Sequence, residues 1–247
     1  MSALADRAAV VTGGSRGIGR AIVERLARDG AHVVFNYARH QRAAEEVVAA
    51  VRGRGGTAEC LRLDLAETGA AERLMERAQE SLGRLDILVN NAALSFGVAP
   101  LAEISEEDFD RALTVNTRST FVTMRYAARH MPDGGRIINI STLNTVRPAP
   151  GNAPYAASKG AVEQLSLVAA QELGPRGITV NVVSPGATDT ELLRSTNSPE
   201  NLDMAVAATP LRRLGQPSDV ADVVGFLASD DGRWLTGQNL HATGGIA

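Results

Sequence analysis

The chain has 247 residues, 44% hydrophobic and 21% charged, which predicts a globular domain with a sizeable core and excludes a disordered chain. Its formal net charge of −3 gives no electrostatic reason to bind nucleic acid or an anionic membrane, and no apolar run is long enough to cross a membrane. The single cysteine, Cys60, excludes an intrachain disulfide and a cysteine-based zinc site and, with no signal peptide at the N-terminus, favours the reducing cytoplasm.

Short apolar runs alternate with amphipathic stretches along the whole chain. We expect strands at residues 8–12, 31–36, 58–63, 85–89, 136–140, 178–183 and 237–240, and helices at 18–28, 43–54, 67–82, from 105 onward, at 155–173 and at 218–227. With no internal repeat or linker, this alternation predicts one α/β domain over residues 1–247. Its core is a doubly wound parallel sheet of about seven strands with helices on both faces. Residues 187–214 have a weak, polar pattern and are expected to form a lid over a substrate.

A glycine-rich loop follows the first expected strand, with Gly13, Gly17 and Gly19 in the spacing Gly-x-x-x-Gly-x-Gly. Glycines let the backbone approach a ligand closely, and the start of the next helix offers N–H groups and a positive dipole end to a phosphate. A tight turn without a ligand would show the same spacing. The strand–loop–helix setting favours a nucleotide site.

The end of the second expected strand bears on the choice of nucleotide. An NAD site normally places a carboxylate about 20 residues past the glycine loop, where it accepts the ribose 2′-hydroxyl. This chain has Asn36 there, with Arg39 shortly after it and Arg16 in the loop. The missing anion and the two arginines favour NADP(H) over NAD(H). The alternative is that both arginines are ordinary solvated surface charges.

Tyr155 and Lys159 stand four residues apart directly after Pro154, so they are expected on one face of a helix. Tyrosine has an ordinary pKa of about 10, and a nearby ammonium lowers that pKa toward neutrality. The pair therefore predicts a phenol that exchanges a proton with an alcohol or carbonyl oxygen. The alternative is a solvated helix face on which the lysine stem packs against a ring.

These motifs, in this order and spacing, resemble those of the short-chain dehydrogenases/reductases over essentially the whole chain. The residues that carry the resemblance are Thr12, Gly13, Gly17, Gly19, Asn90, Asn91, Ala92, Asn116, Tyr155, Lys159, Pro185 and Gly186. Within the family the chain is most similar to the bacterial 3-oxoacyl-acyl-carrier-protein reductases and glucose dehydrogenases. The resemblance implies a Rossmann fold, a homotetramer, and NADP(H)-dependent reduction of a ketone or 3-oxoacyl group.

The resemblance also implies a role for individual residues. Tyr155 would be the general acid, Lys159 would bind the nicotinamide ribose and lower the pKa of Tyr155, and Asn116 would position a water molecule. The implied cofactor contacts are Gly13, Ser15, Arg16, Ile18 and Gly19 for the phosphates, Asp64 and Leu65 for the adenine, Asn91 and Ala92 for the ribose, and Pro185, Gly186 and Thr188 for the carboxamide.

One catalytic position departs from the family pattern, which usually has a serine thirteen residues before the tyrosine. Here that residue is Thr142, and Ser141 precedes it. Because successive residues of a strand face opposite ways, only one of the two hydroxyls is expected to meet the substrate oxygen. The spacing favours Thr142, and Ser141 stays open as the alternative.

The sequence leaves the substrate and the partners open. Four histidines without ligand spacing predict no metal site. A partly apolar substrate pocket is expected from Leu94, Phe96, Val98, Leu143, Val146, Leu192 and Leu193. Arg125, Arg129 and Arg176 are candidates for contact with an acidic acyl carrier protein, and the apolar residues Val162, Leu165, Leu167 and Val168 favour a homo-oligomer. Alternative functions are an NAD-dependent alcohol or sugar dehydrogenase and a non-catalytic nucleotide-binding sensor.

Overall fold

The computed structural model describes residues 3–95 and 97–247, so Phe96 lies outside the described part of the chain. The expected parallel sheet is confirmed: seven strands pair in the order β3-β2-β1-β4-β5-β6-β7, all parallel. The strands are β1 (Ala8–Val11), β2 (His32–Tyr37), β3 (Thr57–Arg62), β4 (Ile87–Asn90), β5 (Arg136–Ile140), β6 (Thr179–Pro185) and β7 (Asn239–Ala242).

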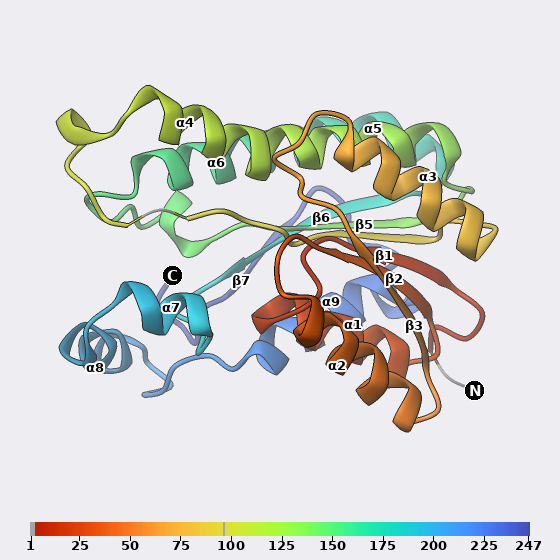
Figure 1. Cartoon of the computed structure of the whole chain (residues 1–247), viewed down its shortest axis with the longest axis horizontal. Coiled ribbons are helices and arrows are strands. Elements are labelled where there is room, and N and C mark those ends of the chain that lie inside the picture. The colour runs from red at the N-terminus through yellow and green to blue at the C-terminus, as the bar shows by residue number, and fades with distance from the viewer. Residues whose placement is uncertain (1–2, 96) are drawn as a thin grey trace.

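Helices cover both faces of this sheet, as the alternating pattern predicted. They are α1 (Gly17–Arg28), α2 (Gln41–Gly53), α3 (Ala70–Leu82), α4 (Glu106–Ala112), α5 (Ser119–His130), α6 (Ala153–Leu173), α7 (Glu191–Thr196), α8 (Pro199–Ala208) and α9 (Pro217–Ala228). Figure 1 shows α3, α4, α5 and α6 above the sheet and α1, α2 and α9 below it. None of the described helices combines the length and the apolar character needed to cross a bilayer.

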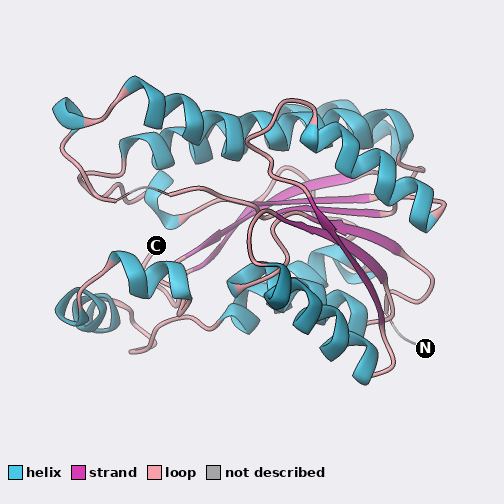
Figure 2. Ribbon diagram, viewed as in Figure 1, coloured by secondary structure: helices cyan, strands magenta, loops and turns pink. Residues whose placement is uncertain are grey.

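The two faces of the sheet build two separate cores, because alternate strand residues point to opposite sides. Val11 and Phe35 pack with α1, α2 and α9 in one core, whereas Val10 and Val34 pack with α3 and α5 in the other. Figure 2 shows the sheet lying between these two helical layers. The buried residues of each face fix the strand register, and the register fixes where each strand ends.

The strand order has a point of reversal at the ends of two central strands. β1 lies between β2 and β4, so the chain first builds outward to β3 and then crosses back to the other side of β1. Ligands of such sheets bind outside the carboxyl ends of the strands at this point of reversal. The loops after β1 and β4, which the sequence singled out, meet there.

The structure differs from the sequence expectation in the stretch that begins at Ser105. The Ser105 hydroxyl caps α4, accepting the Asp108 N–H at 3.1 Å. The expected single long helix is then interrupted by a π-helical segment, Leu113–Arg118, before α5 begins. A π turn inserts extra backbone into a helix and turns its side chains. This segment carries Asn116, which is fully buried.

Residues 187–214 also hold more regular structure than their weak pattern suggested. Thr190 caps α7 by accepting the Leu193 N–H, and Ser198 caps α8 by accepting the Asn201 N–H. Pro199 occupies the first position of α8, where its missing N–H costs nothing. Ser-Pro is a helix-start signal that the sequence interpretation missed. Both helices project beyond the layered part of the molecule in Figure 1.

Candidate active site

The glycine loop after β1 is fastened to the end of β4. The Thr12 hydroxyl accepts hydrogen bonds from the backbone N–H groups of Asn91 and Ala92, both at 2.9 Å, and the Asn91 amide donates to the carbonyls of Thr12 and Gly13. A Cβ on Gly19 would lie 2.1 Å from the Gly13 carbonyl oxygen, so only glycine fits there. The Asn91 side chain thus builds the loop, where the sequence had suggested that it contacts a ribose.

The N-terminus of α1 opens onto this loop. Arg16 precedes the helix in an extended conformation, and no described side chain caps the first N–H groups. Such N–H groups are donors for a phosphate. Ser15 is buried, and Ile18 packs against the core.

The start of α7 covers the glycine loop. Arg16 forms an exposed ion pair with Glu191 at 3.2 Å. The methyl carbon of Thr190 lies 3.3 Å from the position of a Cβ on Gly17. Arg16, expected at the phosphates, is therefore also tied to the segment expected to form the lid, and Thr190 adjoins the phosphate loop without having been singled out from the sequence.

The Asn36 amide is engaged with backbone groups of the protein. The side chain is buried: Oδ1 accepts the Gly13 N–H and Nδ2 donates to the Leu63 carbonyl, both at 2.9 Å. The amide therefore ties the glycine loop to the sheet and to the end of β3. Arg39, just after β2, is exposed.

The turn after β3 contains the two residues expected at the adenine. The Asp64 carboxylate accepts the Ala66 N–H at 3.0 Å, which shapes the turn. Leu65 is 6% exposed and belongs to the core between the sheet and α3. Leu65 thus contributes mainly packing, and Asp64 is the more accessible of the two.

Asn116 links the loop after β4 to α6. Its Oδ1 accepts the Leu94 N–H at 2.7 Å, and its Nδ2 donates to the Leu94 carbonyl and to the Ser158 hydroxyl, both at 2.9 Å. Ser158 in turn donates to the Tyr155 carbonyl at 2.7 Å. The amide expected to hold a water is thus engaged with protein groups and fixes the first turn of α6, where Ser158 is a contact that the sequence did not indicate.

Tyr155, Thr142 and Lys159 meet where β5 ends against α6. The Thr142 side chain lies beside the Tyr155 hydroxyl, where it stabilises the phenolate form. The Lys159 ammonium donates to the Ile140 carbonyl at 2.7 Å and lies 6.0 Å from the centre of the Tyr155 ring. Lys159 is only 2% exposed. The shared helix face predicted for the tyrosine and the lysine is present.

The expected fall in the pKa of Tyr155 is absent from the structure. Burial raises the pKa of Tyr155 above its ordinary value, and the hydrogen bond with Thr142 opposes that rise. Burial also lowers the pKa of Lys159 to about 8, against the attraction of Glu163, which raises it. The phenol is therefore held in its protonated form, because a phenolate in this buried place is poorly solvated.

Ser141 and Thr142 face different partners, as residues of alternating direction should. The Ser141 hydroxyl donates to Oε1 of Glu163 at 2.5 Å, whereas Thr142 contacts Tyr155. The geometry thus favours Thr142 as the hydroxyl beside the phenol. Glu163, which lies one turn after Lys159 on α6, was not singled out from the sequence, although its four-residue spacing from Lys159 was visible.

The segment after β6 turns against the end of β7. The Gly186 N–H donates to the Ala242 carbonyl at 3.0 Å, and a Cβ on Gly186 would lie 3.0 Å from Cα of Thr243. The Thr188 hydroxyl donates to the Gly186 carbonyl at 3.0 Å. Pro185, the last residue of β6, begins this turn beside β7.

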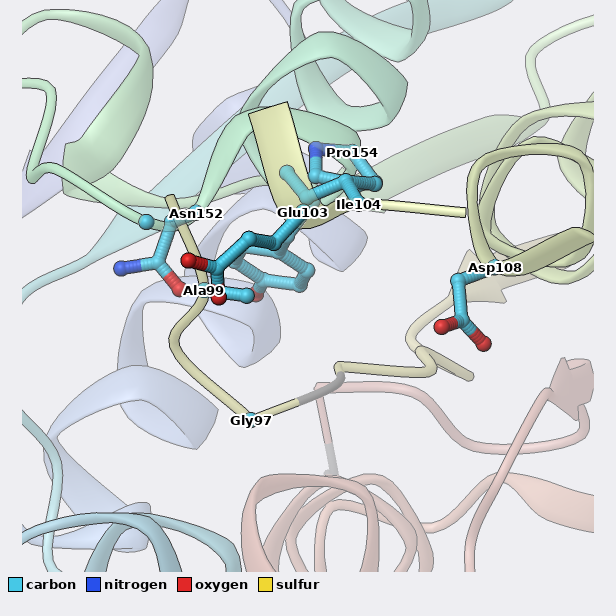
Figure 3. Close-up of a pocket in the computed structure, with 9 residues that line it drawn as sticks. Gly97, Ala99, Glu103, Ile104, Asp108, Asn152 and Pro154 are labelled. Carbon is cyan, nitrogen blue, oxygen red and sulfur yellow. The ribbon is translucent and has the colours of Figure 1, made fainter. Parts of the chain in front are cut away.

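A small cavity of about 50 Å³ adjoins Tyr155. Figure 3 shows Asn152, Pro154 and Glu103 around it, the loop through Gly97 along one edge, and Asp108 set apart on α4. None of the described apolar residues that the sequence suggested for the pocket lines this cavity. Its lining instead mixes small and apolar residues with the carboxylates of Glu103 and Asp108.

Comparison with known proteins agrees with this arrangement. Residues 13–247 match the family model described as Enoyl-(Acyl carrier protein) reductase. An uncharacterized oxidoreductase of Methylorubrum extorquens is 45% identical over 248 residues, which cover all of both chains. A short-chain dehydrogenase/reductase from Serratia marcescens has a structure similar to this one, with a TM-score of 0.94, 43% identity and 99% of each chain covered. The chain belongs to the short-chain dehydrogenase/reductase family.

Another solved member of the short-chain dehydrogenases/reductases shows a bound cofactor. The angucycline C-6 ketoreductase LanV, solved with bound NADP, is 40% identical with a TM-score of 0.93, over 99% of this chain and 97% of LanV. The chain is accordingly an oxidoreductase of this family, and the glycine loop, the open N-terminus of α1 and the joined loops after β1 and β4 fit a nicotinamide dinucleotide. No described group of His, Cys, Asp or Glu side chains is arranged to hold a metal ion.

Proposed function

We propose that the protein reduces a ketone to a secondary alcohol with NADPH, with Tyr155 as the proton donor, and that it acts in the cytoplasm. The observation that carries this proposal is that Tyr155 lies beside Thr142, with the buried Lys159 ammonium 6.0 Å from its ring centre, where β5 ends against α6. The NADP bound to the related ketoreductase LanV supports the choice of cofactor.

The side chains divide the chemistry in a simple way. Bound NADPH supplies the hydride to the carbonyl carbon. Thr142 hydrogen-bonds the carbonyl oxygen, and Tyr155 donates its proton to that oxygen. Because burial keeps the pKa of Tyr155 above its ordinary value, the donor is protonated at neutral pH, which suits reduction. Lys159 binds the nicotinamide ribose and stabilises the phenolate that remains, and Asn116 keeps the start of α6 in place.

The direct test is a panel of ketones and 3-oxo esters incubated with NADPH, followed by the loss of NADPH absorbance. We expect turnover of at least one ketone, with an alcohol formed for each NADPH consumed. Binding of NADPH without turnover across the whole panel would instead favour the nucleotide-binding sensor. Turnover of alcohols or sugars with NAD⁺ alone would favour the NAD-dependent dehydrogenase.

Arg39 is expected to contact the 2′-phosphate of NADPH. Arg39→Ala should weaken NADPH binding about 10-fold, the scale of one charge-assisted hydrogen bond, and should leave NADH binding within about twofold. Titration of both cofactors by fluorescence measures the two affinities. Arg42→Ala on the exposed side of α2, where Arg42 pairs with Glu46, is the matched control and should change neither. Equal weakening of NADPH and NADH by Arg39→Ala would remove the argument for the phosphate.

A free small ketone fits the site better than an acyl group on a carrier protein. Two of the arginines considered for carrier binding are already paired, Arg125 with Glu72 at 2.7 Å and Arg176 with Asp133 at 2.9 Å. The carboxylates of Glu103 and Asp108, which line the cavity beside Tyr155, would also repel an acidic carrier. The ion pair of Arg16 with Glu191 supports a role for residues 187–214 as the cover of the substrate.

We also propose that the chain forms a homotetramer. On α6, Val162 is buried, but Leu167 and Val168 are 44% and 56% exposed, and Phe121 on α5 is 46% exposed. Such apolar exposure on two adjacent helices suits contact with a second copy. Light scattering should give a tetramer for the wild type and a smaller species for Val168→Glu. A wild-type monomer at micromolar concentration would refute the assembly.

A further inference from the structure

Lys159 is a single lysine buried inside the protein. It is the only lysine in the chain, against 24 arginines, and it is 2% exposed. A buried ammonium is costly unless an opposite charge compensates it. The hydrogen bond to the Ile140 carbonyl supplies a partial charge, and a full counter-charge has to come from elsewhere.

The elements around Lys159 offer one carboxylate. On α6 the titratable neighbours are Tyr155, at 6.0 Å from the ammonium to the ring centre, and Glu163, one turn further along. After β5 the chain presents the Ser141 and Thr142 hydroxyls. From the π-helical segment comes an uncharged amide. Of the described side chains facing Lys159, Glu163 is therefore the one that can carry a negative charge at neutral pH.

Residues at the end of β5 bind both Lys159 and Glu163. The Ile140 carbonyl accepts from the Lys159 ammonium at 2.7 Å, and the next residue, Ser141, donates to the Glu163 carboxylate at 2.5 Å. Two consecutive residues of the strand thus fix two side chains four positions apart on α6. This gives Ser141 a use that does not involve contact with the substrate.

We propose that Glu163 is a positioning residue whose carboxylate, fixed by Ser141, keeps the buried Lys159 an ammonium and holds it at the end of β5. The catalytic consequence rests on the proposed function, because Lys159 acts there on the ribose and on Tyr155. The effect of Glu163 on the charge of Lys159 does not rest on the proposed function, since it concerns the protein without cofactor. In that state burial lowers the pKa of Lys159 and Glu163 raises it.

The single lysine allows a direct test. In protein labelled with ¹³C and ¹⁵N at lysine, one side-chain signal reports the titration of Lys159 in the absence of cofactor. Glu163→Gln keeps the size of the side chain and the acceptor for Ser141 but removes the charge. It should lower the pKa of Lys159 by about one pH unit, the lower end of the effect of a nearby opposite charge.

Two further variants isolate the charge. Glu172→Gln removes a carboxylate from the exposed far end of α6, about 20 Å along the helix, and should leave the titration unchanged. Glu163→Asp keeps the charge and should stay close to the wild type. An unchanged titration in Glu163→Gln, or an equal shift in Glu163→Asp, would overturn the proposal.

The pH profile of kcat/KM separates this proposal from the proposed function. Glu163→Gln should move the alkaline limb to lower pH by the same amount as the lysine signal, with less loss of rate at pH 6 than at pH 8. A rate lowered equally at every pH, with the titration unmoved, would overturn the positioning role. A shifted lysine titration in a protein that turns over no ketone would leave the role of Glu163 intact and reject the reductase.

Discussion

Tyr155→Phe should lower kcat about a thousandfold while leaving the affinity for NADPH within a few-fold. A positioned general acid contributes about 10²–10⁴ to a rate, and the phenylalanine ring keeps the packing but has no proton to give. The interaction of the Thr142 side chain with the Tyr155 oxygen would be lost with the hydroxyl. Single-turnover measurements with saturating NADPH would isolate the chemical step.

Tyr126→Phe is the matched control for this substitution. Tyr126 lies on α5, is 9% exposed, and packs its ring 4.3 Å from that of His130. The same chemical change there should leave kcat within about twofold. Near-wild-type turnover in Tyr155→Phe would reject the proton-donor role, whereas an equal loss in both variants would point to a general effect on packing.

Lys159→Met should abolish most of the activity and at the same time stabilise the protein without cofactor. The substitution removes the cation expected at the ribose and replaces a buried ammonium by an apolar side chain of similar length. With a pKa of about 8 in the folded state against an ordinary value of 10.5, burial of the charged group costs about 3 kcal/mol at neutral pH. Loss of the hydrogen bond to Ile140 offsets about 1 kcal/mol of that gain.

The pH dependence of this difference has a definite sign. Below about pH 8 the folded and unfolded states both carry the proton on Lys159, so the cost of burial is fully present. Between about pH 8 and 10.5 the unfolded state binds more protons than the folded state, and the stability of the wild type therefore rises relative to the variant. Urea unfolding at about pH 7 and 9.5 measures both. A methionine variant that is less stable at pH 7, or a difference independent of pH, would contradict this account.

The fold was largely predictable, because periodicity and strand–helix alternation report burial directly. The importance of Gly13, Tyr155 and Lys159 was predicted from local spacing. In the structure Gly13 follows β1 and Lys159 contacts the end of β5, at the same edge of the parallel sheet. The π-helical segment was not predictable. Nothing in the sequence around Asn116 separates a helix with one wide turn from a regular helix.

The orientation of polar side chains was the part that sequence could not provide. Asn36 bonds Gly13, which is 23 positions away, and Ser141 bonds Glu163, 22 positions away. Such partners depend on how strands and helices meet, not on local pattern. The same holds for the pKa of Tyr155. The expected fall depends on the Lys159 ammonium pointing toward the Tyr155 hydroxyl, and the four-residue spacing does not fix where the ammonium points.

The most direct test of the proposed mechanism is a crystal structure of the protein with NADP⁺. We expect the Tyr155 hydroxyl to face the nicotinamide with room between them for a substrate oxygen, and the Lys159 ammonium moved from the Ile140 carbonyl toward the ribose hydroxyls. A nicotinamide bound away from Tyr155, or a phenol directed into bulk water in that complex, would contradict the mechanism.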